Sequence, residues 1–273
     1  MTVVLQVSDP HFGTERPEVE TALRALTDVL APRLLVVSGD VTQRARRKQF
    51  AAARRFIDTL AVPVSLVIPG NHDLPLFNIA ARALSPYAEY RRAFGDDLEP
   101  SHEAEDLLVL CVNTTRARRH KDGEVSPEQI ERVAARLRAA SPRQLRIVVT
   151  HQPMLVTRLA DEQNLLHGYR DAARAWAAAG ADLVMGGHIH LPYVRPLDEA
   201  VLGLARPVWA VQAGTALSHR VRDGVPNSVN VVRYDAASGA SACQVERWDY
   251  QAAARRFECH STTPIPLHRA AHG

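Results

Sequence analysis

The chain has 273 residues, of which 46% are hydrophobic and 23% charged, as is typical of a soluble protein with a sizeable core. Its formal net charge of +3 argues against a strong nucleic-acid or membrane partner, and no segment approaches the 18 or so uninterrupted apolar residues of a membrane span. The three cysteines give no disulfide framework, so we expect a cytoplasmic protein in which Cys111, within an apolar run, is a buried thiol.

Strand-like apolar runs alternate with helix-like runs along the chain, an order that predicts an α/β fold. Strands are expected at residues 3–7, 34–37, 64–68, 107–112, 147–150, 183–185, 208–213, 228–234 and 242–248. Helices are expected at 17–30, 43–61, 127–140 and 170–179, and residues 76–106 are expected to be mostly helix and loop. The helix at 127–140 begins with Ser126 as N-cap, Pro127 at the first position and Gln129 completing a capping box.

No linker is long enough to divide the chain, so residues 1–273 are predicted to form a single domain. Its catalytic core covers about residues 1–215, and its β-rich C-terminal part about 206–250. The tail at 265–273 is expected to be flexible.

Five of the predicted strands end in polar clusters. In strand order these clusters contain Asp9 and His11, Asp40, Asn71 and His72, His151, and His188 and His190. Ligands of α/β sheets bind beyond the carboxyl ends of strands, so we expect the clusters to meet. Carboxylate, imidazole and amide ligands without a thiolate suit Mn, Fe, Co or Zn. The seven ligands, without His72, exceed what one ion uses in an open site and suit two ions that share a carboxylate.

Each cluster alone has an ordinary explanation. Asp9 or Asp40 could cap a turn or helix after its strand, and His151 alone is more often a hydrogen-bonded histidine than a ligand. The GGHIH segment that contains His188 could be a turn between strands. The joint occurrence of the clusters, all at strand ends, favours a metal centre.

The motifs D-x-H, G-D, G-N-H-D, H-x-P and G-H-x-H occur in this order at residues 9–11, 39–40, 70–73, 151–153 and 187–190. This series resembles that of the calcineurin-like metallophosphoesterase superfamily, over about residues 3–215. The resemblance implies a four-layer α/β/β/α sandwich of two mixed sheets flanked by helices. It also implies two divalent metal ions and a hydroxide between them that attacks phosphorus.

Roles for individual residues follow from the same resemblance. Asp9, His11, Asp40 and His190 would hold the first metal. Asp40 would bridge to the second metal, which Asn71, His151 and His188 would complete. His72 would face the scissile phosphate, stabilise the developing charge and protonate the leaving oxygen, and Asp73 would orient its ring.

In length and motif order the chain is nearest to the small cyclic-nucleotide and glycerophosphodiester phosphodiesterases. We therefore expect a phosphodiesterase with a small phosphorylated substrate; the alternatives are a phosphomonoesterase or a nuclease of the same superfamily. Gln152, where those phosphodiesterases often have histidine, counts against a cyclic-nucleotide substrate. His72 stands where the lipid A pathway pyrophosphatases usually have arginine, which argues against that branch of the superfamily. A chain of 273 residues leaves little room for the capping domain of the repair nucleases, which argues against a repair nuclease. A non-catalytic scaffold, like the retromer subunit of this fold, is the least expected because every ligand is present.

Two segments are predicted to bind the substrate. Asn113 follows a strand and precedes a basic loop at residues 116–121, so Asn113 or one of these cations could approach phosphate oxygens. Arg220 and Arg222 follow the last metal motif and could bind an anionic leaving group. The alternative for both segments is an ordinary solvated loop.

Overall fold

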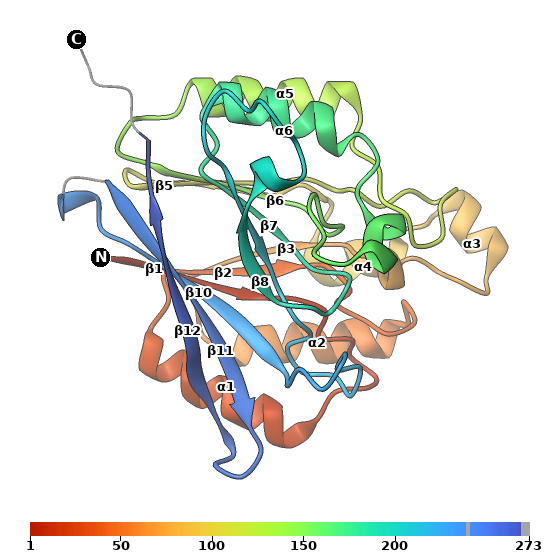
Figure 1. Cartoon of the computed structure of the whole chain (residues 1–273). Coiled ribbons are helices and arrows are strands. Elements are labelled where there is room, and N and C mark those ends of the chain that lie inside the picture. Colours follow the sequence, from red (N-terminus) through yellow and green to blue (C-terminus); the bar gives the residue numbers. More distant parts are fainter. Residues whose placement is uncertain (239–240, 269–273) are drawn as a thin grey trace.

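The structure, a computed structural model, describes residues 1–238 and 241–268. In this part of the chain two six-stranded mixed sheets face each other, with strand orders β12-β11-β10-β1-β2-β3 and β4-β5-β6-β7-β9-β8. Helices cover the outer faces: α1 and α2 lie against the first sheet, and α5 and α6 against the second (Figure 1). The predicted four-layer α/β/β/α sandwich is confirmed.

The first sheet consists of β1 (Thr2–Val7), β2 (Leu34–Ser38), β3 (Val64–Ile68), β10 (Ser228–Tyr234), β11 (Ala242–Gln251) and β12 (Arg256–Pro266). The second consists of β4 (Ser101–Glu103), β5 (Leu107–Cys111), β6 (Leu145–Val149), β7 (Leu183–Gly186), β8 (Tyr193–Pro196) and β9 (Trp209–Gln212). The α-helices are α1 (Pro17–Leu30), α2 (Arg47–Thr59), α3 (Ile79–Leu84), α4 (Ala88–Phe94), α5 (Pro127–Arg138) and α6 (Tyr169–Ala179). Short 3₁₀ turns lie at η1 (Asn71–Asp73), η2 (Leu159–Asn164), η3 (Leu197–Glu199) and η4 (Ala236–Ser238).

The central strands are apolar throughout because both of their faces are buried. In β1, Val3 and Leu5 pack into the core beneath α1 and α2, while Val4 between them points into the core between the two sheets. In β6, Val149 faces the inter-sheet core and Val148 the core beneath α5 and α6. Alternate residues therefore serve two cores, which explains the uninterrupted apolar runs of the sequence.

The predicted capping box is present at the start of α5. The Ser126 side chain accepts a hydrogen bond from the backbone N–H of Gln129, and the Gln129 side chain accepts one from the backbone N–H of Ser126. Helix α2 begins later than predicted, at Arg47, because residues 43–46 form a loop whose N–H groups at Arg44 and Arg46 donate to the Gln49 side chain.

Three strands, β4, β8 and β12, were not predicted. All three are at sheet edges, where one side of the strand lacks a neighbour and polar residues and proline are tolerated. The predicted flexible tail is wrong at its start: Ile265 is fully buried in β12 and pairs with Cys243. Residues 269–273 of that tail lie outside the described residues. Cys111 is buried, as predicted. Among the described helices, none has the length and apolar character needed to cross a membrane.

Candidate active site

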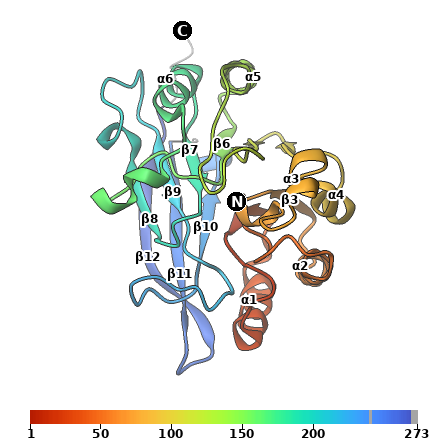
Figure 2. The same ribbon diagram turned by 90° about the vertical axis from the view of Figure 1, so that its right-hand side faces the viewer.

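The predicted polar clusters converge at the carboxyl ends of the parallel strands of both sheets. Strands β1, β2 and β3 run parallel in one sheet, and β5, β6 and β7 in the other. The loops that leave β1, β2, β3, β6 and β7 therefore reach one end of the sandwich, which faces the viewer in Figure 2. These loops bring together the predicted ligands Asp9, His11, Asp40, Asn71, His151, His188 and His190.

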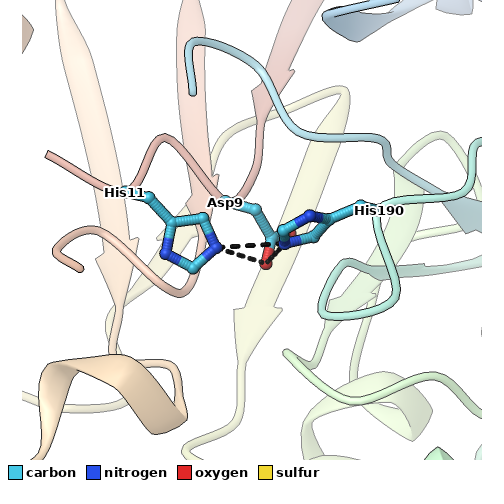
Figure 3. A group of neighbouring side chains, drawn as sticks. All are labelled: Asp9, His11 and His190. Carbon is cyan, nitrogen blue, oxygen red and sulfur yellow. Dashed lines mark hydrogen bonds and ion pairs between the residues drawn. The ribbon is translucent and has the colours of Figure 1, made fainter. Parts of the chain in front are cut away.

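Asp9, His11 and His190 form the first group (Figure 3). The Nε2 atoms of His11 and His190 lie 3.0 Å apart. One Asp9 oxygen, Oδ1, lies 3.3 Å from Nε2 of His190 and 3.8 Å from Nε2 of His11. All three residues are buried, and three ligand atoms of the type that divalent metals prefer point at one another.

Asp40, His151 and His188 form the second group. Nε2 of His151 lies 3.3 Å from Oδ1 of Asp40 and 3.3 Å from Oδ1 of Asn71. The other Asp40 oxygen, Oδ2, lies 3.8 Å from Nε2 of His11 in the first group. Each Asp40 oxygen thus faces a different group, which is the arrangement that a carboxylate shared by two cations requires.

The donor set fits divalent cations because its imidazoles are held in the tautomer that a metal needs. Nδ1 of His190 lies 2.7 Å from the carbonyl of Arg220, and Nδ1 of His151 lies 2.8 Å from the carbonyl of Ser38. A carbonyl can only accept, so both Nδ1 atoms carry the proton and both Nε2 lone pairs face the groups. Within the described residues, the buried Nδ1 of His188 has no hydrogen-bond partner, which leaves it available to a cation.

The electrostatics of the buried site also favour cations. Burial opposes charge on Asp9 and Asp40, yet the neighbouring imidazoles lower the pKa of Asp9 to about 2 and that of Asp40 well below its usual range. Burial also opposes charge on His151, but Asp40 raises its pKa to about 9. Burial lowers the pKa of His11 and His188 to about 3. The carboxylates are therefore charged and His11 and His188 are neutral, as metal binding requires, whereas His151 holds a proton that a bound cation would displace from Nε2.

Backbone strain is concentrated in the same residues. Asp9, His11, Asp40, His188 and His190 have φ angles of 50°, 46°, 48°, 73° and 55°. This left-handed conformation is costly for residues other than glycine, at about 1 to 3 kcal/mol each, and clusters at functional sites. Five of the seven predicted ligands are thus held in an unfavourable conformation.

In the GNHD loop after β3, at residues 70–73, Asp73 has a different role from the predicted one. The Asp73 carboxylate accepts hydrogen bonds from the backbone N–H groups of Gly70, Val41 and Thr42, at 2.7 to 2.9 Å, and from the Thr42 hydroxyl at 2.8 Å. Its oxygens are committed to these donors, so the prediction that Asp73 orients the His72 ring is wrong. Asp73 instead ties the loop after β3 to the loop after β2, which carries Asp40.

We expect Asp73→Ala to lower the free energy of unfolding by about 2 to 4 kcal/mol, because it strands several buried backbone donors. Thermal or urea unfolding, compared with Asp96→Ala, whose side chain is 98% exposed, measures this effect. Unchanged stability with reduced turnover would restore the ring-orienting role.

The His72 ring is held by Gln43 and Arg220. Its Nδ1 lies 3.0 Å from the Gln43 carbonyl and therefore carries a proton, while its Nε2 lies 3.1 Å from Nη1 of Arg220. The same Arg220 nitrogen donates to the Gln43 side chain at 3.1 Å. Gln43 was not predicted, although it lies only three residues after Asp40, because a glutamine in a loop carries no distinctive signal.

A cavity of about 630 Å³ opens above the metal ligands. Two of the predicted substrate-binding residues, Arg220 and Arg222, line it, and Lys121 from the predicted basic loop lines it as well. Asn113 does not line this cavity: it lines a separate pocket, and its amide is engaged by Thr115 and Tyr87.

Gln152, the residue that departs from the motif of the small phosphodiesterases, has a structural role. It is fully buried, its Nε2 donates to the Lys121 carbonyl at 3.1 Å, and its Oε1 accepts from the Thr114 hydroxyl at 2.5 Å. Gln152 therefore anchors the loop that carries Lys121.

Comparison with known proteins identifies the family. Residues 2–192 match the family model of the calcineurin-like phosphoesterases, and the chain belongs to this family. The predicted ligands, from Asp9 to His190, all lie within the matched residues. A comparison with curated proteins found no match.

Among solved structures, the fold is similar to purple acid phosphatase PPD1 from yellow lupin (Lupinus luteus) seeds, with a TM-score of 0.70 and 12% identity. The alignment covers 97% of this chain and 53% of the lupin chain, so this chain spans about half the length of that protein. A dimetal phosphatase from Danio rerio is similar with a TM-score of 0.63 and 11% identity, covering 98% of this chain and 99% of that one. At identities of 11% and 12%, these two structures show that the fold is shared and nothing more.

Proposed function

We propose that this chain is a phosphodiesterase that uses two divalent metal ions to hydrolyse a small phosphodiester. One observation carries the proposal: two ligand groups that share Asp40 lie at the floor of a cavity whose wall presents His72 and Arg220. The ions would be Mn, Fe, Zn or Co, held by the two groups described above.

When bound, the two cations would lower the pKa of a water molecule and draw charge from a phosphoryl oxygen. The guanidinium of Arg220, at the cavity wall, is suited to bind a second phosphoryl oxygen. When Arg220 binds that oxygen, the guanidinium N–H that donates to His72 would donate to the substrate instead. Because the Gln43 carbonyl holds the proton of Nδ1, Nε2 is the His72 atom that would take up a second proton once Arg220 turns to the substrate, and would give that proton to the leaving oxygen.

The preference for a diester is supported by the length and motif order shared with the small phosphodiesterases. It is also supported by a cavity of about 630 Å³, which leaves space for two substituents on phosphorus. The low net charge of +3 supports a small substrate rather than nucleic acid or a membrane. Among the described residues the cysteines form no disulfide, which supports a cytoplasmic location.

The proposal is tested by hydrolysis of bis(p-nitrophenyl) phosphate and p-nitrophenyl phosphate, each with added Mn²⁺ and with a chelator. Chelator-sensitive cleavage that favours the diester is the expected result. Preference for the monoester would make the protein a phosphatase. Protein that binds no metal after Mn²⁺ addition would instead be a scaffold.

We expect Asn71→Ala to weaken binding of the second ion by more than about 100-fold, the upper end of the effect seen when only an outer-shell partner is lost. Turnover should fall at limiting Mn²⁺ and recover partly at high Mn²⁺. Titration of the activity with Mn²⁺ measures this effect, with Asn113→Ala, outside the cavity, as the matched control. An unchanged Mn²⁺ requirement would remove Asn71 from the ligand set.

A further inference from the structure

The three cations that line the cavity differ in how their charge is compensated. Arg222 donates to Asp161 at 2.9 Å and to Asp223 at 3.1 Å, and it also binds the Ile189 carbonyl. Its charge is therefore balanced by two carboxylates, and it joins the loop after the last metal motif to η2. Arg222 is a structural cation.

Lys121 and Arg220 face neutral partners. Nζ of Lys121 donates to Oε1 of Gln163 at 3.0 Å, and the Arg220 guanidinium contacts Gln43 and His72. Neither has a carboxylate partner among the contacts of the described chain, so both keep their positive charge toward the cavity. Arg220 is beside the catalytic imidazole, where it serves the phosphoryl group that reacts. Lys121 comes from a different loop and has no such role.

The backbone at Lys121 is held in place by hydrogen bonds to buried residues. Its carbonyl accepts from the buried Gln152, which directly follows the metal ligand His151. Gly123 covers the same side chain so closely that a Cβ there would lie 2.2 Å from Oε1 of Gln152. The next residue, Glu124, donates its N–H to the Thr114 carbonyl at 2.8 Å. The loop is thus anchored to the metal centre rather than merely solvated.

We propose that Lys121 forms a subsite for a second phosphate group of the substrate, so that the preferred substrates are phosphodiesters that carry a further phosphate. This inference rests on the proposed function, because the reacting phosphodiester must occupy the metal groups. A lysine ammonium is a common phosphate ligand, and a charge-assisted hydrogen bond from an uncompensated cation is stronger than one between neutral groups. The cavity is large enough to hold a nucleoside-sized spacer between the two phosphates.

The test uses two matched substrates, the p-nitrophenyl ester of thymidine 3′-phosphate with and without a 5′-phosphate. We expect kcat/KM to be about tenfold higher for the 5′-phosphorylated ester, as one charge-assisted contact provides. Lys121→Gln should abolish this preference and leave kcat/KM for the unphosphorylated ester unchanged. Arg118→Gln is the matched control, because Arg118 lies on the same loop but pairs with Glu124 at a separate pocket. Equal kcat/KM for the two esters in the unaltered protein would overturn the inference.

A binding experiment separates this inference from the proposed function. Calorimetry in the presence of Mn²⁺ compares thymidine 3′,5′-bisphosphate with thymidine 3′-monophosphate. The bisphosphate should bind about tenfold more tightly, and the difference should vanish in Lys121→Gln. Absence of turnover with this difference intact would refute the phosphodiesterase and keep the subsite. Equal affinities, or a difference that survives Lys121→Gln, would refute the subsite.

Discussion

Replacement of Asp40 by asparagine is expected to remove both metal ions and to lower kcat by about three orders of magnitude or more. Asp40 is buried, and its two oxygens face different groups: one is 3.3 Å from His151 and the other 3.8 Å from His11. Asparagine has nearly the same shape but no charge, and its NH₂ cannot act as a ligand. The substitution therefore removes the shared ligand and the negative field that also raises the pKa of His151.

Metal content by elemental analysis and turnover of bis(p-nitrophenyl) phosphate measure this effect. Asp58→Asn is the matched control, since Asp58 is an exposed residue of α2 whose partner is Arg54. It should keep both the metal and the activity. An Asp40→Asn protein that retains two equivalents of Mn²⁺ would contradict the shared-carboxylate arrangement.

His72→Ala is expected to lower kcat by about 100- to 1,000-fold, as the loss of one transition-state contact typically does, while metal content stays near normal. The imidazole lines the cavity beside Arg220, and its Nδ1 is anchored to the Gln43 carbonyl. It is also close enough to His11 and Asp40 to serve as a ligand, so the experiment has a definite alternative.

Parallel measurement of metal content and kcat distinguishes the two roles of His72. His120→Ala, on an exposed loop, is the matched control and should behave like the unaltered protein. Metal loss in His72→Ala as large as that in Asn71→Ala would place His72 among the ligands. Normal metal content with normal kcat would exclude both roles.

Much of the fold could be predicted because the central strands are buried on both faces. The apolar runs that became β1 and β2 leave little choice of structure, and each is followed at once by its polar cluster. The edge strands β4, β8 and β12 were missed for the opposite reason. They are polar or contain proline, and only their neighbours in the sheet make them strands.

The sequence by itself determined the residues that converge, because each predicted ligand follows a strand and parallel strands deliver their ends to one place. Tertiary structure alone decided how the other polar groups are used. Asp73 accepts from a loop 31 and 32 residues away, and Arg220 contacts a histidine 148 residues away. Contacts of this kind depend on the directions of loop side chains. Those directions are set by backbone angles, such as the left-handed φ of 48° at Asp40, that local sequence does not reveal.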